Sequence, residues 1–427
     1  MSATAGSAQG APHSGPRRDT AVAVPRGLAG VIVTDTAIGD VRGREGFYHY
    51  RQYSAVDLAE QCGFEDVWHL MLHGELPDAA ARDRFVREAA PLRRIPGAVR
   101  PLLAPVAEAT RADGPLAGVK ALLPLIGSAY GMRPLYDTAP ERRTRDALAL
   151  AAVVPTLIAA LHRLQQGEEP VEPSDALGYA ANYLRMVTGA EPDAKRARAV
   201  EAYLVSTIDH GFNASTFTGR VIASTGADLA SCAAGALGAL TGPLHGGAPS
   251  RALDTLDAIG GPERARAWLT ERVQAGDRIM GFGHPVYRTE DPRARMLRGI
   301  AYGFGGELVE FAAQVEREVV DVLAELKPGR ELHTNVEFWA GVVMELCGLP
   351  RTMFTPTFAA SRVVGWTAHA LEQAADSKII RPSARYVGPA APQPVPAVRR
   401  PGTAGKPGRK NRAGGVTRRG ERRISDM

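Results

Sequence analysis

The chain has 427 residues, of which 45% are hydrophobic and 23% are charged, and these proportions are typical of a globular protein. The net charge of +5 is unevenly distributed: residues 389–427 hold ten Lys and Arg against two Asp and Glu, a charge of +8, which leaves −3 for the rest. The positive charge is therefore no evidence for a nucleic-acid-binding fold. The longest apolar run, residues 147–161, is shorter than the ~20 residues that span a membrane.

The cysteines and histidines exclude two further classes of protein. Cys62, Cys232 and Cys347 are too sparse for a disulfide-stabilised scaffold. No CxxC motif or His/Cys cluster indicates a metal site. The polar residues after Arg17 and Arg18 interrupt any secretory signal. We therefore expect a cytoplasmic protein that binds no metal.

In chain order, residues 1–25 are rich in Ser, Gly, Ala and Pro, which predicts disorder. Residues 27–53 alternate loosely as in a short hairpin. Helical patterns separated by Pro and Gly then predict a mainly α fold, because no sustained strand pattern competes. The expected helices cover residues 54–62, 64–76, 79–90, 99–108, 117–130, 141–165, 174–188, 194–208, 227–240, 249–256, 262–274, 292–302, 307–324, 338–347 and 359–374.

Residues 389–427 are first rich in proline and then basic and rich in glycine. Such a segment buries too little apolar area to offset the entropy lost on ordering, so we predict disorder here as well. A solvated extension without a partner is the favoured interpretation. An electrostatic tether to RNA, a membrane or an acidic protein is the alternative.

Three of the ten histidines lie where an apolar stretch ends and glycine follows. His210 lies in DHGFNAST, His245 in GPLHGG and His284 in GFGHPVYR. Adjacent glycine lets a ligand approach both the imidazole and the backbone, and histidine exchanges protons near neutral pH. Each histidine alone is more simply read as structural. Three of them within 75 positions favour a shared site.

Two charged residues interrupt apolar helical segments. Glu337, in NVEF, begins one of them, where an acid most often interacts with the helix dipole. Arg362, in SRVVGW, is embedded in another. A buried arginine needs an anionic partner, which is either a protein carboxylate or a ligand.

Taken in order, these segments resemble the citrate synthase family. The resemblance covers about residues 24–389, and the order GPLHGG, GFGHPVYR with DPR, NVEF and SRVVGW is highly specific. It implies an all-α homodimer with a large helical domain, a small helical domain and an active site in the cleft between them. The implied large domain comprises residues 26–246 and 356–388, and the small domain comprises residues 247–355.

The resemblance also implies a reaction, in which acetyl-CoA, oxaloacetate and water give citrate and CoA in the tricarboxylic acid cycle. His245 then hydrogen-bonds the thioester carbonyl, Glu337 removes the α-proton, and His284 polarises the ketone of oxaloacetate. No cofactor, nucleic acid or membrane is implied. The implied oxaloacetate-binding residues are His210, Arg293, Arg362 and, from the partner subunit, Arg381. The implied CoA-binding residues are Ile279, Met280, Gly281, Phe282, Gly283, Lys327 and Arg330.

Two positions depart from the family pattern. Glu337 stands where many members have Asp, and Gly211 stands where related sequences often have Glu. The longer side chain of Glu337 shifts the carboxylate by roughly 1 Å, and a displacement on that scale can cost ~10²-fold in rate. Two alternatives therefore stay open: a 2-methylcitrate synthase that uses propionyl-CoA, and a weakly active or non-catalytic CoA-binding paralogue.

Overall fold

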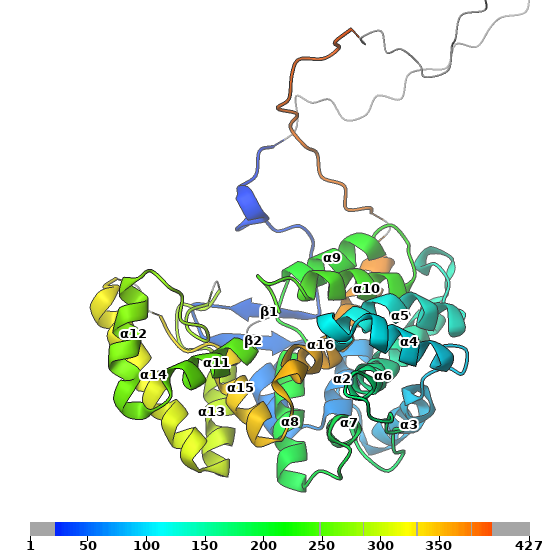
Figure 1. Ribbon diagram of the computed structural model, residues 1–427. Coiled ribbons are helices and arrows are strands. Elements are labelled where there is room, and N and C mark those ends of the chain that lie inside the picture. The colour runs from blue at the N-terminus through cyan, green and yellow to red at the C-terminus, as the bar shows by residue number, and fades with distance from the viewer. Residues whose placement is uncertain (1–21, 247–248, 285, 330–331, 377, 395–427) are drawn as a thin grey trace, which may run out of the picture. The chain divides into compact units, whose positions relative to one another are not determined.

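The computed structural model describes residues 22–246, 249–284, 286–329, 332–376 and 378–394. The described residues fall into two compact units, Val22–Arg381 and the residues from Pro382 onward. The first unit is built almost entirely of helices, so the prediction of a mainly α fold is confirmed (Figure 1). The predictions for residues 1–25 and 389–427 fall largely outside the described residues.

A small antiparallel sheet precedes the helices. Its strands are β1 (Gly39–Arg42), β2 (Phe47–Tyr50) and β3 (Tyr53–Ser54), in the order β1-β2-β3. This confirms the hairpin expected between residues 27 and 53 and limits it to the second half of that range. Tyr48 and Tyr50 are buried, and their hydroxyls donate to the carbonyls of Ser206 and Val205 at 3.0 and 2.9 Å. The hairpin is thereby fixed to the end of the helix that precedes His210.

The helices agree closely with the expected ranges. Among the described residues, short 3-10 turns accompany them at Arg26–Leu28, Ala90–Arg93, Arg100–Leu102, Arg111–Asp113, Leu135–Asp137, Pro262–Arg264 and Arg351–Met353. The α-helices are α1 (Ala55–Gln61), α2 (Phe64–His73), α3 (Ala79–Ala89), α4 (Leu103–Ala109), α5 (Pro115–Ala129), α6 (Pro140–Gln165), α7 (Tyr179–Thr188), α8 (Ala194–Thr207), α9 (Ala214–Ala223), α10 (Leu229–Leu240), α11 (Pro249–Ile259), α12 (Ala265–Gln274), α13 (Pro292–Phe304), α14 (Glu307–Leu326), α15 (Val336–Leu346) and α16 (Phe354–Ala375).

Three elements differ most from the sequence-based expectation, and one of them is helix α16, which begins at Phe354 rather than at residue 359. Helix α9 was not among the expected helices. Asn213 caps it by accepting from the backbone N–H of Thr216 at 3.1 Å. Helix α7 begins at Tyr179 rather than at residue 174. The reason is that Ser174 is held outside the helix by the side chain of Asn182, which bonds both its N–H and its carbonyl.

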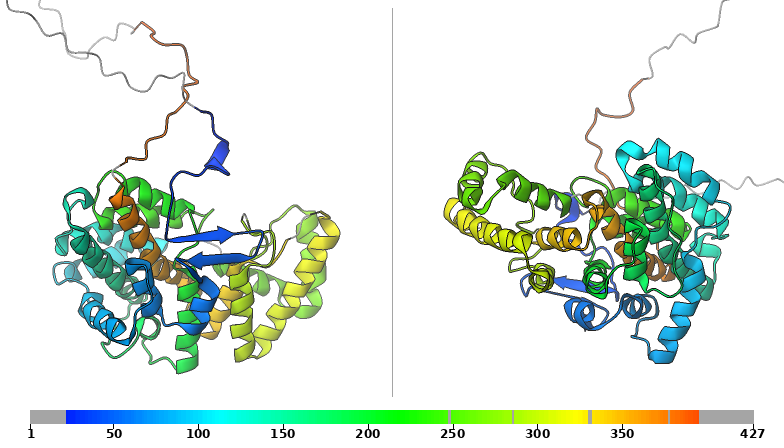
Figure 2. Two further views of the ribbon diagram at one scale, coloured as in Figure 1. Left: turned by 180° about the vertical axis from the view of Figure 1, so that it is seen from behind. Right: turned by 60° about the horizontal axis from the view of Figure 1, so that its bottom comes forward.

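The core is organised around α6 and α16, which pack against each other and against α10. Helix α6 is long and apolar enough to cross a membrane, but 89% of its most apolar window is buried in the protein, as in the core helix of a globular fold. Helices α11 to α15 contact one another, and Figure 2 shows α12 and α14 at the opposite end of the unit from α3 to α5. The expected domain boundaries at residues 247 and 355 stay predictions.

Candidate active site

His210 lies just beyond the end of α8, on the turn that leads into α9. Its Nε2 atom is 2.9 Å from the hydroxyl of Tyr287, and its ring centroid lies 5.5 Å from those of both Tyr48 and His284. Burial, followed by the nearby charge of Arg293, lowers the pKa of His210 well below its usual value. His210 is therefore a neutral side chain at physiological pH.

The segment before His284 pairs with the segment that leads into α15. The N–H of Gly283 donates to the carbonyl of His333 at 2.8 Å, and the N–H of Asn335 donates to the carbonyl of Gly281 at 2.9 Å. Gly281 has φ +89°, and a Cβ there would approach the Cβ of Phe338 to 2.9 Å. Glycine therefore permits both the turn and the close packing. This pairing brings the third histidine segment, which begins at Gly281, beside the NVEF segment, which begins at Asn335.

The hydrogen bonds around His284 determine which of its nitrogens carries the proton. Its Nδ1 atom accepts from the backbone N–H groups of Val286 and Tyr287 at 3.0 and 3.1 Å. A neutral imidazole that accepts at Nδ1 carries its proton on Nε2. Burial, and then the charge of Arg293, lower the pKa of His284 to about 4. We assign His284 as a neutral Nε2–H donor, because these two contacts are shorter than the 3.4 Å between its Nε2 atom and Nη2 of Arg293, which can also only donate.

Arg293 connects His284 to the start of α15. Its guanidinium forms a buried ion pair with Asp291 at 2.8 Å, and its Nη2 atom lies 3.4 Å from Nε2 of His284. The carboxylate of Asp291 also accepts from the backbone N–H of Val336 at 3.0 Å. Asp291 thereby fixes Arg293 and the first turn of α15 relative to each other.

Glu337 is the second residue of α15 and is half-buried. The side chain of Asn335 caps the helix by accepting from the backbone N–H of Glu337 at 3.0 Å. Burial is the main cause of the raised pKa of Tyr203. The charges of Arg362 and Arg293 lower this pKa, and the charge of Glu337 raises it. Glu337 and the two arginines therefore lie within electrostatic range of the same buried tyrosine.

His245 follows α10 and contacts the first turn of α9. The backbone N–H of Ser215 donates to its Nε2 atom at 3.3 Å, and the hydroxyl of Ser215 is 2.9 Å from the same atom. Trp366 donates its indole N–H to that hydroxyl at 3.1 Å. The backbone N–H of Ser215 favours a neutral His245 with its proton on Nδ1, whereas the Ser215 hydroxyl, which donates its own proton to Oδ1 of Asn213 at 2.8 Å, can only accept from Nε2. Burial, and then the charge of Arg362, lower the pKa of His245 to about 4.

Arg362 lies in the middle of α16 and is only 1% exposed. Its Nε atom donates to the carbonyl of Thr207 at 2.8 Å, and its Nη2 atom is buried without a hydrogen-bond partner. Within the described residues no carboxylate forms an ion pair with Arg362. Gly365 allows this approach, because a Cβ there would lie 2.1 Å from the carbonyl oxygen of Ile208.

The structure therefore brings together six of the residues singled out in the sequence. His210, His284 and Arg293 are in contact, and Arg362 lies within electrostatic range of His210 and His245. Glu337 lies in the first turn of α15, and backbone N–H groups of that turn donate to the side chains of Asp291 and Asn335.

The remaining predicted residues lie outside this group, and one of them lies outside the described residues. Arg381 is exposed beyond the end of α16, and Lys327 is half-buried at the end of α14. Ile279, Met280, Gly281, Phe282 and Gly283 form the segment that leads to His284. Arg330 lies outside the described residues.

Several residues of the site were not singled out as site residues in the sequence. Tyr287 and Asp291 follow His284 within the same motif, and only their contacts show that they orient His210 and Arg293. Ser215 stands in the motif that contains His210, yet it contacts His245 instead. Among the described residues no group of His, Cys, Asp and Glu could hold a metal ion, and all three cysteines are free.

Comparison with known proteins decides the family. Residues 27–383 match the family model described as citrate synthase, C-terminal domain. The chain belongs to the citrate synthase family. It is 35% identical to a citrate synthase from Synechocystis over 85% of this chain and 90% of that protein. It is 36% identical to a 2-methylcitrate synthase from Mycobacterium tuberculosis over 86% and 91% of the two chains.

A solved structure gives the same fold. The citrate synthase of Thermoplasma acidophilum, described as a ternary complex with carboxymethyl coenzyme A and oxaloacetate, matches with a TM-score of 0.79. It is 27% identical, over 86% of this chain and 97% of that one. The expected resemblance and the fold of the citrate synthase family, with its large and small helical domains, are thus confirmed.

Proposed function

We propose that this member of the citrate synthase family condenses acetyl-CoA with oxaloacetate to give citrate and CoA. The observation that carries the proposal is the unpaired Nη2 atom of Arg362, a buried cation that lies beside neutral histidines. A buried charge of this kind is costly unless an anion completes it. The carboxylate of a keto-diacid supplies that anion through a charge-assisted hydrogen bond.

In the first step the thioester is converted to its enolate. Glu337 removes a proton from the α-carbon, and the electron pair of the broken C–H bond moves toward the thioester carbonyl oxygen. His245 donates from Nδ1 to that oxygen, which is why a neutral imidazole with its proton on Nδ1 is required. Losing one such donor to a developing oxyanion typically costs ~10²–10³-fold in rate.

In the second step the enolate carbon forms a bond to the ketone carbon of oxaloacetate. The ketone π-bond breaks, its electron pair moves to oxygen, and His284 delivers its Nε2 proton to that alkoxide. Water then cleaves the thioester to release citrate and CoA. These steps use only acid–base groups of the protein and no cofactor. Shielding the enolate from solvent is the role we assign to the predicted interdomain cleft.

The substrates are held by cations and by backbone. We assign His210, Arg293 and Arg362 to oxaloacetate, together with Arg381 of the partner subunit in a homodimer. The segment 279–283 is assigned to the adenine of CoA, and Lys327 and Arg330 to its phosphates. We further propose that the enzyme is cytoplasmic and acts in the tricarboxylic acid cycle.

A second candidate is 2-methylcitrate synthesis from propionyl-CoA. It is favoured by the Mycobacterium tuberculosis relative of that name, which is as similar to this chain as the Synechocystis citrate synthase. One methylene alters binding in an apolar pocket by only ~1–3 kcal/mol, so the two activities can overlap.

A thiol-release assay with acetyl-CoA and propionyl-CoA, each with and without oxaloacetate, separates the candidates. We expect oxaloacetate-dependent CoA release, with a higher kcat/KM for acetyl-CoA. A higher kcat/KM for propionyl-CoA would assign the chain to 2-methylcitrate synthesis instead. No release with either substrate would contradict catalysis and leave the CoA-binding paralogue.

A further inference from the structure

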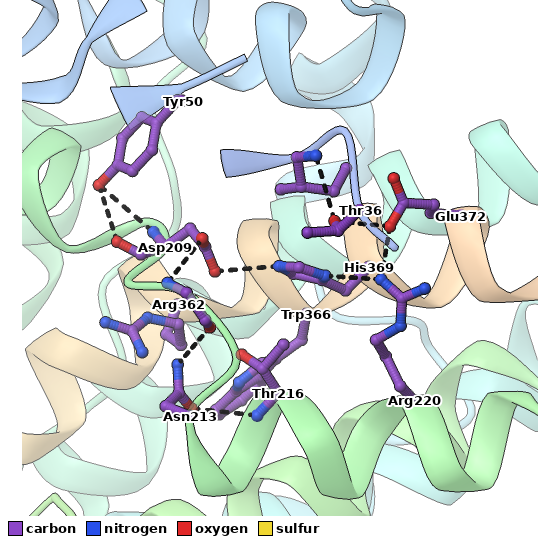
Figure 3. A network of polar contacts seen from close by, with 12 residues as sticks. Thr36, Tyr50, Asp209, Asn213, Thr216, Arg220, Arg362, Trp366, His369 and Glu372 are labelled. Atoms are coloured by element: carbon purple, nitrogen blue, oxygen red, sulfur yellow. Dashed lines mark hydrogen bonds and ion pairs between the residues drawn. The ribbon is translucent and has the colours of Figure 1, made fainter. Parts of the chain in front are cut away.

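A network of polar residues, most of them buried, extends from the turn that bears His210 to the N-terminal segment. It runs from Asp209 through His369 and Arg220 to Glu372, and Figure 3 shows Arg362 beside its first member. Asp209, His369 and Arg220 are each at most 2% exposed. The steps of the condensation use none of these four side chains, so the burial of Asp209, His369 and Arg220 calls for a separate explanation.

The hydrogen-bond partners of His369 fix which atom donates at each contact of this network. Nδ1 of His369 lies 3.1 Å from Nη1 of Arg220. An arginine can only donate, so Nδ1 accepts and the proton of His369 sits on Nε2. That Nε2–H therefore donates to Oδ1 of Asp209, at 3.1 Å. The second oxygen of Asp209 accepts from the backbone N–H of Gly211 at 3.1 Å, so both carboxylate oxygens are engaged.

Glu372, at the other end of the network, is held by several hydrogen bonds as well. Glu372 accepts from Arg220 at 2.5 Å, from the backbone N–H of Ala37 at 2.7 Å and from the hydroxyl of Thr36 at 2.7 Å. Arg220 also donates to Gln373 at 2.9 Å. Arg220 is thus held by two residues besides His369, which leaves His369 with one available acceptor, Asp209.

Asp209 is also the carboxylate best placed to neutralise Arg362. The Nε atom of Arg362 bonds to the carbonyl of Thr207, two residues before Asp209, and the charges of Asp209 and Arg362 influence each other's pKa. Even so, no ion pair within 4 Å joins them among the described residues, and Nη2 of Arg362 stays without a partner. The carboxylate is turned instead toward His369 and Gly211.

We propose that His369 is a positioning residue which holds Asp209 away from Arg362, so that Arg362 stays open for a carboxylate of oxaloacetate. The same contact fixes the turn 209–211, in which Gly211 has φ +64°, and so orients His210. Without the donor from His369, Oδ1 of Asp209 is a buried acceptor that lacks its partner. Rotation toward Arg362 then satisfies both charges and closes the substrate site.

This inference rests on the proposed function, and three variants test it. His369→Leu removes the donor, His369→Gln keeps an N–H at similar reach, and His369→Leu/Asp209→Asn removes both the donor and the competing charge. In each variant, oxaloacetate affinity is measured by calorimetry and KM for both substrates by thiol release. Thermal unfolding monitors the fold.

We expect His369→Leu to weaken oxaloacetate binding by roughly tenfold to a hundredfold, the factor for one hydrogen bond to a charged group. KM for acyl-CoA should be unchanged. His369→Gln should retain most of the affinity, and the double variant should bind oxaloacetate more tightly than His369→Leu. A purely structural role predicts the opposite order, because the double variant loses more buried hydrogen bonds. Equal affinity in wild type and His369→Leu, or no recovery in the double variant, overturns the proposal.

A crystal structure of His369→Leu decides the same point without substrate. We expect an ion pair between Asp209 and Arg362, and an Asp209 carboxylate that stays on Gly211 overturns the proposal. Wild-type protein that binds no oxaloacetate would refute the proposed function. The crystal structure would then still show whether His369 keeps Asp209 and Arg362 apart.

Discussion

At the scale of single residues, the candidate site depends on where protons are held. His245 and His284 each use one nitrogen to accept backbone N–H groups, and we assign the other ring nitrogen of each to a substrate oxygen. Glu337 begins a helix whose cap and first turn are fixed by Asn335 and Asp291. An enolisation followed by an addition requires a neutral hydrogen-bond donor for each substrate oxygen and one base. These side chains supply them.

Glu337 is the most direct target at this scale. We expect Glu337→Gln to reduce kcat by ~10²–10⁴-fold, the usual contribution of a general base, with little change in oxaloacetate affinity. Glu337→Asp retains a base and should keep far more activity than the amide. Thiol release and calorimetry measure the two effects, and near-normal turnover of Glu337→Gln would remove Glu337 from the mechanism.

The two histidines also predict how stability depends on pH. Burial, with Arg362 for His245 and Arg293 for His284, lowers both pKa values to about 4. Between the unfolded value of ~6.5 and this folded value, only the unfolded chain takes up protons at these sites, so acid favours unfolding there. We expect the thermal midpoint to fall as pH drops from about 6.5 to about 4.

The control for this pH dependence is His245→Asn, in which the slope of midpoint against pH should be shallower. The comparison isolates His245 because other titrating groups are common to both proteins. Parallel curves for wild type and variant would contradict the assigned protonation.

At the scale of elements, the site is formed where α16 packs against the turn after α8. The backbone of α16 approaches this turn closely at Gly365, since a Cβ there would lie 2.1 Å from the carbonyl oxygen of Ile208. We expect Gly365→Ala to destabilise the protein by roughly 1–3 kcal/mol, the typical cost of overpacking, and to weaken oxaloacetate binding by displacing Arg362.

Gly299 supplies the matched control. It lies within α13, and a Cβ there meets nothing within 4 Å. Gly299→Ala should therefore gain about 0.5–1 kcal/mol from helix propensity alone. Denaturant unfolding compares the two variants, and an equal effect of both substitutions would refute close packing at Gly365.

The elements also show what the sequence could predict. Helix positions followed from apolar periodicity, and the start of α1 followed from Ser54, whose side chain accepts from the N–H of Asp57. Helix α9 was not predicted, because its Asn-Ala-Ser-Thr start was interpreted as part of the candidate ligand-binding segment around His210. The pairing of segment 281–283 with segment 333–335 was beyond reach, since no local pattern specifies which distant loops meet. The order of the motifs indicated the site residues. The tautomers of the site histidines depend on their hydrogen-bond partners, which only the packed structure shows.

At the scale of the whole molecule, the proposed homodimer makes each site depend on both chains. Arg381 is exposed in the single chain and is assigned to the partner's site. We expect Arg381→Gln and Glu337→Gln proteins to be weakly active alone. After unfolding and refolding together, half of the dimers are mixed, and each mixed dimer has one site with both residues intact.

The refolded mixture should therefore recover about a quarter of wild-type activity, as random pairing of two chains in a two-fold dimer requires. Refolding each variant separately is the control. A mixture no more active than the mean of the separate variants would show that Arg381 serves its own chain.

The convergence of His245, His284 and Glu337 on one pair of substrates is tested most directly by a crystal structure with carboxymethyl-CoA and oxaloacetate. We predict Nδ1 of His245 and the carboxylate of Glu337 at the carboxymethyl group, and Nε2 of His284 at the ketone oxygen. Each should lie within about 2.6–3.2 Å, the reach of a hydrogen bond. Ligands bound where any of these three side chains faces a different surface would contradict the proposed reaction.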